Sequence, residues 1–101
     1  MRMLLQAVLP HEPINTSIRN GSLGKTMQRI MEEIKPEAAY FTVSNGKRTV
    51  IMVVTVSDPS KVPAFAEPFF LQFNADVSFN VVMSPEELGK AGLDSLGKKW
   101  A

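Results

Sequence analysis

The sequence predicts one α+β domain, in which four strands form an antiparallel sheet and two helices cover one of its faces. Three observations lead to this prediction. Four segments have the apolar composition of β-strands, a two-residue turn joins the second to the third, and a helical pattern fills each of the two longer connections. The length of 101 residues suits a single domain, so residues 1–101 are expected to form one unit.

The chain is expected to begin with a short strand followed by a long helix. Residues 3–9 (MLLQAVL) form an apolar run closed by a proline, which is typical of a buried strand. Apolar residues from Ile18 to Ile34, which form one stripe from Leu23 onward, then predict a helix, with Asn15 or Thr16 as its cap and Pro36 as its stop. Two glycines in the first half of this helix are expected to make its first turns irregular.

The middle of the chain predicts a β-hairpin. Residues 38–44 (AAYFTVS) and 49–56 (TVIMVVTV) are both strand-like, and Asn45-Gly46 between them tolerates the positive φ angles of a type I′ turn. This turn fixes the register of the two strands. The expected pairs are Ser44 with Lys47, Thr42 with Thr49, Phe41 with Val50, and Tyr40 with Ile51.

A second helix and a fourth strand follow the hairpin. Asp58 and the proline after it are expected to open an apolar helical stretch that ends at Phe73. Pro63 and Pro68 should kink or divide this helix, because each proline removes a helical N–H. Residues 75–83 alternate between apolar and polar side chains, which predicts a strand with one buried face.

A helical tail is expected at the C-terminus. Ser84 and Glu87 have the spacing of a capping box, which predicts a short helix that ends near residues 89–92. The residues after this helix are expected to dock on the domain through Leu93, Leu96 and Trp100.

The order strand, helix, strand, strand, helix, strand is that of ferredoxin-like domains. Right-handed crossovers place the first and third strands in the centre of the sheet and the fourth and second at its edges. One face of the sheet is then almost wholly apolar and is assigned to the two helices. The opposite face, which we call the open face, is apolar in its centre and polar at its edges, and carries Leu4, Gln6, Val8, Tyr40, Thr42, Ile51, Val53, Ser78, Asn80 and Val82.

The open face predicts a homodimer. Four strands of about seven residues make a face of about 440 Å², which equals or exceeds the largest apolar patch typical of a monomer. An apolar centre with a polar rim is also the usual composition of an interface. We therefore expect two copies to pack through this face with two-fold symmetry. The alternative is that residues 85–100 fold back and cover it.

Several stretches also carry a resemblance to known proteins. KPEAAYFT (35–42), DPSK (58–61), FNADV (73–77) and AGLDSLGKKW (91–100) resemble a family of small uncharacterised bacterial proteins, and the element order resembles the dimeric α/β-barrel superfamily. The resemblance covers nearly the whole chain and implies a homodimeric barrel but no particular activity. No catalytic motif of the monooxygenases, haem-degrading enzymes or isomerases in that superfamily can be placed on these residues.

Composition excludes several classes of site. With no Cys and one His, the chain cannot form disulfides, thiolate metal sites or a His-rich metal site, and no cofactor is expected. A balance of 11 basic and 10 acidic residues argues against partners such as nucleic acids or acidic lipids. No apolar run is long enough to span a membrane, and no cleavage site follows residues 3–9, so we expect a cytoplasmic protein.

The weak candidates for a polar ligand site lie at one edge of the predicted sheet. His11 follows the first strand, and Asn74 and Asp76 start the neighbouring fourth strand. Asp76 could orient His11 as a base, and Arg48 on the same edge could hold an anion. The alternative is an exposed loop histidine beside ordinary surface charges.

Two functions remain open. The first is a non-catalytic homodimeric module that binds a small apolar ligand or a protein partner. The second is a cofactor-independent enzyme, similar to a monooxygenase or an isomerase, that acts on a hydrophobic small molecule. The second requires a cavity between sheet and helices, walled by phenylalanines such as Phe65 and Phe69 and reached by His11 or Tyr40. The alternative for these phenylalanines is an ordinary packed core.

Overall fold

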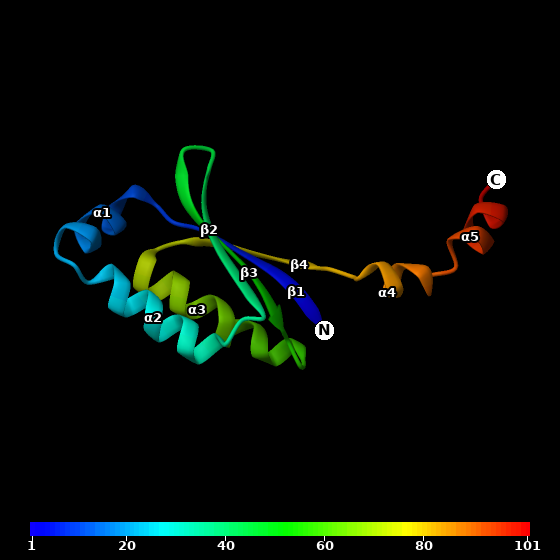
Figure 1. Ribbon diagram of the computed structural model, residues 1–101, viewed down its shortest axis with the longest axis horizontal. Coiled ribbons are helices and arrows are strands. Elements are labelled where there is room, and N and C mark those ends of the chain that lie inside the picture. The colour runs from blue at the N-terminus through cyan, green and yellow to red at the C-terminus, as the bar shows by residue number, and fades with distance from the viewer.

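The computed structural model describes residues 1–101 and contains a four-stranded antiparallel sheet with helices against one of its faces (Figure 1). The strands are β1 (Arg2–Val8), β2 (Ala38–Ser44), β3 (Lys47–Thr55) and β4 (Asp76–Val81). They lie in the order β2-β3-β1-β4, so the predicted α+β class and strand order are confirmed. This order is consistent with a ferredoxin-like fold.

The helices of the body are α1 (His11–Arg19), α2 (Leu23–Ile34) and α3 (Val62–Phe73), and a 3₁₀ turn, η1 (Pro59–Lys61), precedes α3. The prediction of one helix capped by Asn15 or Thr16 is wrong. Glu12 has an extended backbone, and its carboxylate accepts hydrogen bonds from the Thr16 backbone N–H at 3.2 Å and hydroxyl at 2.7 Å. Gly21, with φ of 78°, separates α1 from α2.

The predicted ends of the other helices are largely confirmed. Helix α2 stops at Ile34, where Lys35 turns into the left-handed region just before Pro36. The Asp58 carboxylate caps the 3₁₀ turn by accepting the Ser60 N–H at 2.8 Å. Pro68, in contrast, lies inside α3 without dividing it. A proline removes one helical hydrogen bond. Phe69, which follows Pro68, and Phe73, one turn further on, are buried in the core, and their burial offsets the loss of that hydrogen bond.

The core lies between the sheet and the helices. The register of the hairpin is as predicted, with Phe41 opposite Val50 and Tyr40 opposite Ile51. Alternate positions of the two central strands are fully buried against side chains from the helices. The buried strand residues are Leu5, Ala7, Val50, Met52 and Val54, and the buried helical ones include Ile14, Ile30, Phe69 and Phe73.

The helices do not cover the whole of the face assigned to them. Phe41 and Val43 on β2 point to the helical side of the sheet, yet they are 62% and 69% exposed. Val81, the last residue of β4, and Met83, two residues beyond it, are also exposed. Phe41 and Val43 belong to one edge strand, and Val81 and Met83 lie at and after the end of the other, so the prediction that the helices bury this whole face is wrong.

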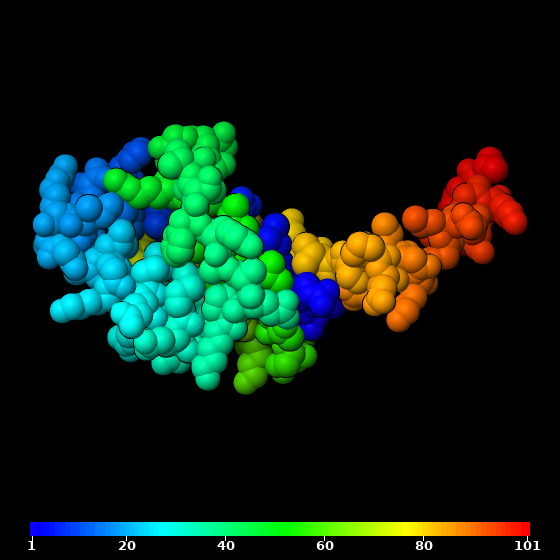
Figure 2. All heavy atoms as spheres, viewed as in Figure 1, coloured from blue at the N-terminus to red at the C-terminus, as the bar shows by residue number.

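The C-terminal residues do not dock on the body. Residues 83–101, which we call the C-terminal arm, carry α4 (Pro85–Gly89) and α5 (Leu93–Lys99) and extend away from the domain (Figures 1 and 2). The molecule measures 59 × 28 × 20 Å, and its radius of gyration is 17.0 Å, against about 13 Å for a compact domain of this length. Trp100 is 76% exposed, and Leu93 and Leu96 are also exposed. The predictions that the tail docks through these residues, or that it covers the open face, are wrong for the single chain.

Truncation of the central aromatic side chain should destabilise the fold. Phe69 is fully buried, and its ring lies 6.3 Å from that of Phe73. We expect Phe69→Ala to lower the free energy of unfolding by about 3–5 kcal/mol, because it leaves a cavity in the core. Urea denaturation at fixed protein concentration measures the change. Leu71→Ala on the outer side of the same helix, at a position 77% exposed, should change it by less than about 0.5 kcal/mol. Equal effects of the two substitutions would show that the core is misassigned.

Candidate functional site

The open face is arranged in rows that run across all four strands. One row contains Tyr40, Ile51, Gln6 and Ser78, which are paired from one edge of the sheet to the other. A second row, two residues along the strands, contains Ala38, Val53, Leu4 and Asn80. A third, on the other side of the first, contains Thr42, Thr49, Val8 and Asp76. Val82 lies beyond β4, where its N–H donates to the carbonyl of Arg2 at 3.3 Å. The ten predicted positions therefore share one face.

The chemistry of this face changes from its centre to its edges. The central strands contribute the apolar side chains of Leu4, Val8, Ile51 and Val53, which are half-buried within the sheet itself. Tyr40 and Thr42 at one edge, and Ser78 and Asn80 at the other, are exposed. Gln6 lies in the centre of the face and is also half-buried. The result is an apolar surface with a polar rim, in which Thr49 of the third row is the fully buried residue.

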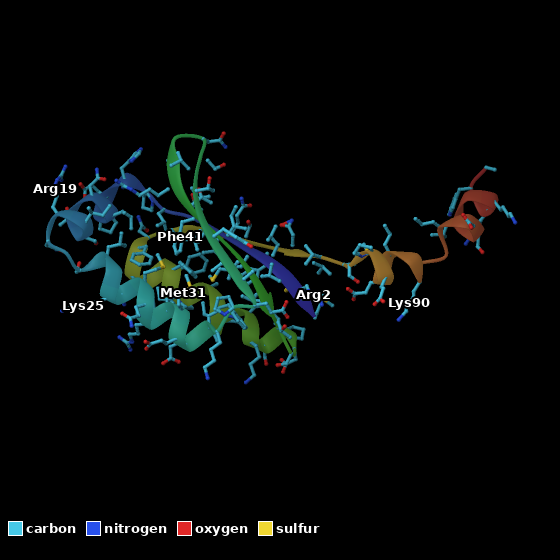
Figure 3. All side chains as sticks on the ribbon, in the orientation of Figure 1. Arg2, Arg19, Lys25, Met31, Phe41 and Lys90 are labelled. Carbon is cyan, nitrogen blue, oxygen red and sulfur yellow. The ribbon has the colours of Figure 1, made fainter.

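A polar cluster closes one end of the open face. The Arg2 guanidinium donates to a Glu87 carboxylate oxygen at 2.9 Å, and its Nε lies 3.6 Å from a Glu37 oxygen. Glu37 also accepts a hydrogen bond from the Thr55 hydroxyl at 3.0 Å. Figure 3 shows Arg2 at the end of the body nearest the arm. This cluster, which sequence reasoning missed, connects the first helix of the arm to β1. Because alternate residues of a strand share a face, the pattern that places Leu4 on the open face also places Arg2 there. This pattern could have predicted that Arg2 is available for an ion pair at this end of the face.

Glu87 is part of the capping box predicted from the sequence. The Ser84 N–H donates to the Glu87 carboxylate at 2.9 Å, and the Glu87 N–H donates to the Ser84 hydroxyl at 3.1 Å. The hydrogen bonds with Ser84, together with the one from Arg2, hold the pKa of Glu87 below its ordinary value. These interactions fix the direction in which α4 leaves the sheet.

The predicted polar site lies at the other end of the sheet. Val8 pairs with Thr49 on one side and with Asp76 on the other, so the end of β1 lies beside the starts of β3 and β4. His11 is exposed and makes no side-chain hydrogen bond, and Asp76 makes none either. The structure thus brings these two residues to one end of the sheet but does not join them through a hydrogen bond or an ion pair.

The other two polar candidates have structural partners. The Arg48 guanidinium donates to the Asn15 side-chain oxygen at 2.8 Å, and the Arg48 carbonyl accepts the Leu9 N–H at 2.8 Å. Asn74 ends α3 in the left-handed region, with φ of 55°. Both residues therefore hold chain turns at this end of the sheet.

The two main hollows in the surface are not lined by the phenylalanines singled out in the sequence. Phe69 is in the core, and Phe65 packs half-buried against it. The larger hollow, about 530 Å³, is a groove between the outer sides of α2 and α3. Its apolar part includes Ile30, Pro63, Pro68 and Leu71, and its charged rim consists of Lys25, Arg29, Glu33 and Glu67. A smaller hollow of about 220 Å³ lies beside the N-terminus and η1.

Neither a metal centre nor a membrane span is visible among residues 1–101. No group of three or more His, Asp or Glu side chains gathers in a way that could hold a metal ion. None of the helices combines the length and the apolar character needed to cross a bilayer. Comparison of the chain with models of protein families gives no match, and comparison with curated proteins gives none either.

Removal of the only histidine should leave the fold intact. His11 is exposed and lacks a side-chain hydrogen bond, so we expect His11→Ala to change the free energy of unfolding by less than about 0.5 kcal/mol. Urea denaturation measures this change. Ile14→Ala in the same helix, at a fully buried position, serves as the contrast and should cost about 2–5 kcal/mol. A large loss from His11→Ala would mean that His11 is buried and paired.

The base of the arm should respond to acid. Because the folded pKa of Glu87 is depressed, its ionised form stabilises the capping box above the unfolded pKa, and this stabilisation is lost as the pH falls through the folded value. We expect the Ser84 amide resonance to report this titration below the usual range of glutamate. Arg2→Met should move the midpoint upward, since it removes one of the hydrogen bonds to the carboxylate. An unchanged midpoint in the variant would contradict the role of Arg2.

Proposed function

We propose that the chain functions as a homodimeric binding module, in which the open faces of two copies pack on one another in the manner of a dimeric α/β barrel. The supporting observation is the uncovered apolar centre of the open face, formed by Leu4, Val8, Ile51 and Val53. Removal of an apolar surface of this extent from water is favourable. In a two-fold dimer, the open face of each copy would cover the open face of the other.

The middle row of the open face suggests what such a dimer would enclose. Gln6 and Ile51 lie in its centre, with Tyr40 and Ser78 at its ends, so amide and hydroxyl groups stand among apolar neighbours. In a face-to-face dimer these groups would bond either to each other across the interface or to a molecule held between the sheets. A suitable ligand is a small, mainly apolar molecule with one or two polar groups.

The enzyme alternative lacks a supporting observation. It requires a cavity between sheet and helices that is walled by phenylalanines. Phe69 and Phe73 pack in the core instead, and neither hollow described above is lined by a phenylalanine. We therefore retain the binding module as the proposal.

A charge on the open face should prevent pairing. We expect Val53→Glu to yield monomers or aggregates, because an interface centre does not accommodate an unpaired carboxylate. Sedimentation velocity measures the mass in solution, and native mass spectrometry of the parent also reveals any retained ligand. Leu71→Glu, an equal charge change on the outer side of α3, is the matched control and should keep the parent mass. If Val53→Glu keeps the mass and stability of the parent, the open face is not the interface.

A further inference from the structure

Strand β2 forms one edge of the sheet, and its outer side has no neighbouring strand. Its side chains are exposed on both faces of the sheet, because Tyr40 on the open face and Phe41 and Val43 on the helical side are all more than 60% exposed. Phe41 is the central residue of the strand and is marked in Figure 3. At the other edge, β4 also contacts α3, and no helix contacts β2 as closely.

The backbone of β2 has unpaired hydrogen-bonding groups at this edge. The Leu9 N–H donates to the Arg48 carbonyl, so the even-numbered residues of β3 bond to β1. Successive residues of a strand direct their backbone groups to opposite sides, so the odd-numbered residues of β3 bond to the residues of β2 that they face, which are Tyr40, Thr42 and Ser44. The intervening residues of β2 direct both N–H and C=O outward, and these residues are Ala39, Phe41 and Val43.

The sequence of β2 does not block the approach of another strand. Exposed sheet edges are usually protected by charged residues, especially lysine, by a proline or by a β-bulge. Residues 38–46 contain neither a charged residue nor a proline, and β2 pairs with β3 without a bulge from Ala38 to Ser44. In contrast, β4 begins with Asp76. An uncharged segment with several aromatic and β-branched residues has the composition of strands that associate with one another.

The edge of β2 is complementary to the same edge of a second copy. In an antiparallel pair with two-fold symmetry, Phe41 lies opposite the partner's Phe41, and Ala39 lies opposite the partner's Val43. Each of these pairs then exchanges both of its backbone hydrogen bonds. This is the one two-fold register in which the three outward-facing residues pair only among themselves. It also places the two phenylalanine rings side by side and Tyr40 beside the partner's Thr42, which are favourable cross-strand neighbours.

This edge is a different surface from the open face. Stacking of two sheets covers side chains that point out of the sheet, whereas the unpaired groups of β2 lie in its plane. The edge therefore stays available in a molecule whose open face is already paired. A two-fold contact between two β2 strands closes on itself, whereas pairing of β2 with β4 of another copy would continue into a filament.

We propose that β2 is a second self-association surface of this chain, where two copies join their sheets edge to edge through antiparallel pairing centred on Phe41. The occupant of the edge is the β2 strand of another copy, and the product is one continuous sheet with both β2 strands at its centre. The contact goes beyond the proposed open-face dimer and does not depend on it. Because one strand pair is a small interface, it adds to that dimer at higher protein concentration.

The absence of Cys from the chain makes the register measurable by crosslinking. In the proposed register the Cα atoms of the two Phe41 residues lie about 5.5 Å apart, within the span of a disulfide, whereas those of the two Thr42 residues lie about 8 Å apart. We expect Phe41→Cys to form a linked dimer under mild oxidation at least about ten-fold faster than Thr42→Cys, because pairing raises the local concentration of the thiols. Gel electrophoresis without reductant measures the linked fraction.

The control for random collision is Leu71→Cys, at an exposed position on α3. It should form linked dimers as slowly as Thr42→Cys. If Phe41→Cys is linked no faster than Leu71→Cys, the proposal is overturned. Equal rates for Phe41→Cys and Thr42→Cys would overturn it as well, because they would contradict the register.

A lysine at the centre of the edge should abolish the contact. Phe41→Lys places two ammonium groups opposite one another, which is destabilising. In sedimentation velocity over a concentration series, we expect the parent to reach at least about twice the mass that Phe41→Lys reaches. Val81→Lys, an equal charge change on the other edge strand, is the matched control and should follow the parent. Circular dichroism verifies the fold.

Two outcomes of the sedimentation series would contradict the edge contact. Equal masses of Phe41→Lys and the parent at every concentration would show that β2 is not a contact. A similar loss of mass in Val81→Lys would indicate pairing of β2 with β4 and would overturn the two-fold contact.

The edge contact and the open-face dimer fail separately. If Phe41→Cys still links two copies that also carry Val53→Glu, the edge contact holds independently of the open face. If Val53→Glu abolishes dimers while Phe41→Cys alone links no copies, the open-face dimer holds and the edge contact is wrong.

Discussion

A sheet has two faces, and this chain provides one layer of helices. Most features of the structure follow from that constraint. The helices bury Leu5, Val50 and Met52 on one side, while Leu4, Ile51 and Val53, one position along the same strands, remain without cover. The C-terminal residues could have formed a second layer, but they extend away from the body. The apolar surface that remains is therefore a property of the fold and not of a few surface side chains.

Interactions at the base of the arm set its direction, but they do not stabilise the helix at its far end. The Ser84–Glu87 capping box and the Arg2–Glu87 pair orient α4 relative to β1 through interactions that are mostly exposed and individually weak. Nothing comparable supports α5. An arm that is oriented at its base but unsupported along its length is suited to a contact formed with another molecule, because little conformational freedom at the base remains to be lost on binding.

The sequence was informative wherever structure is decided by neighbouring residues. Asn45-Gly46 permits a tight turn and so sets the whole hairpin register, and Pro36 ends α2 because it cannot continue a helix. It was less informative where distant residues compete. Pro68 is retained within α3, where its neighbours are buried. A local interaction was also missed in α1, where the Glu12 carboxylate accepts the Thr16 N–H four residues further on. The extended position of the tail could not be predicted from its apolar pattern, since the pattern does not say whether the body of the same chain offers a surface for it.

The same distinction applies to the candidate site. The sequence placed four polar residues at one end of the sheet, and the fold does bring them there. Arg48 is held by Asn15, however, and Asn74 occupies a left-handed helix end, so two of the four stabilise the chain turns. Gln6, in the middle row of the open face, has no such structural role. Its side chain makes no hydrogen bond within the chain, although it lies among apolar neighbours. A buried amide needs a partner, so covering this face without bonding Gln6 would be costly. A ligand or sheet that covered this face would therefore need a polar group opposite Gln6.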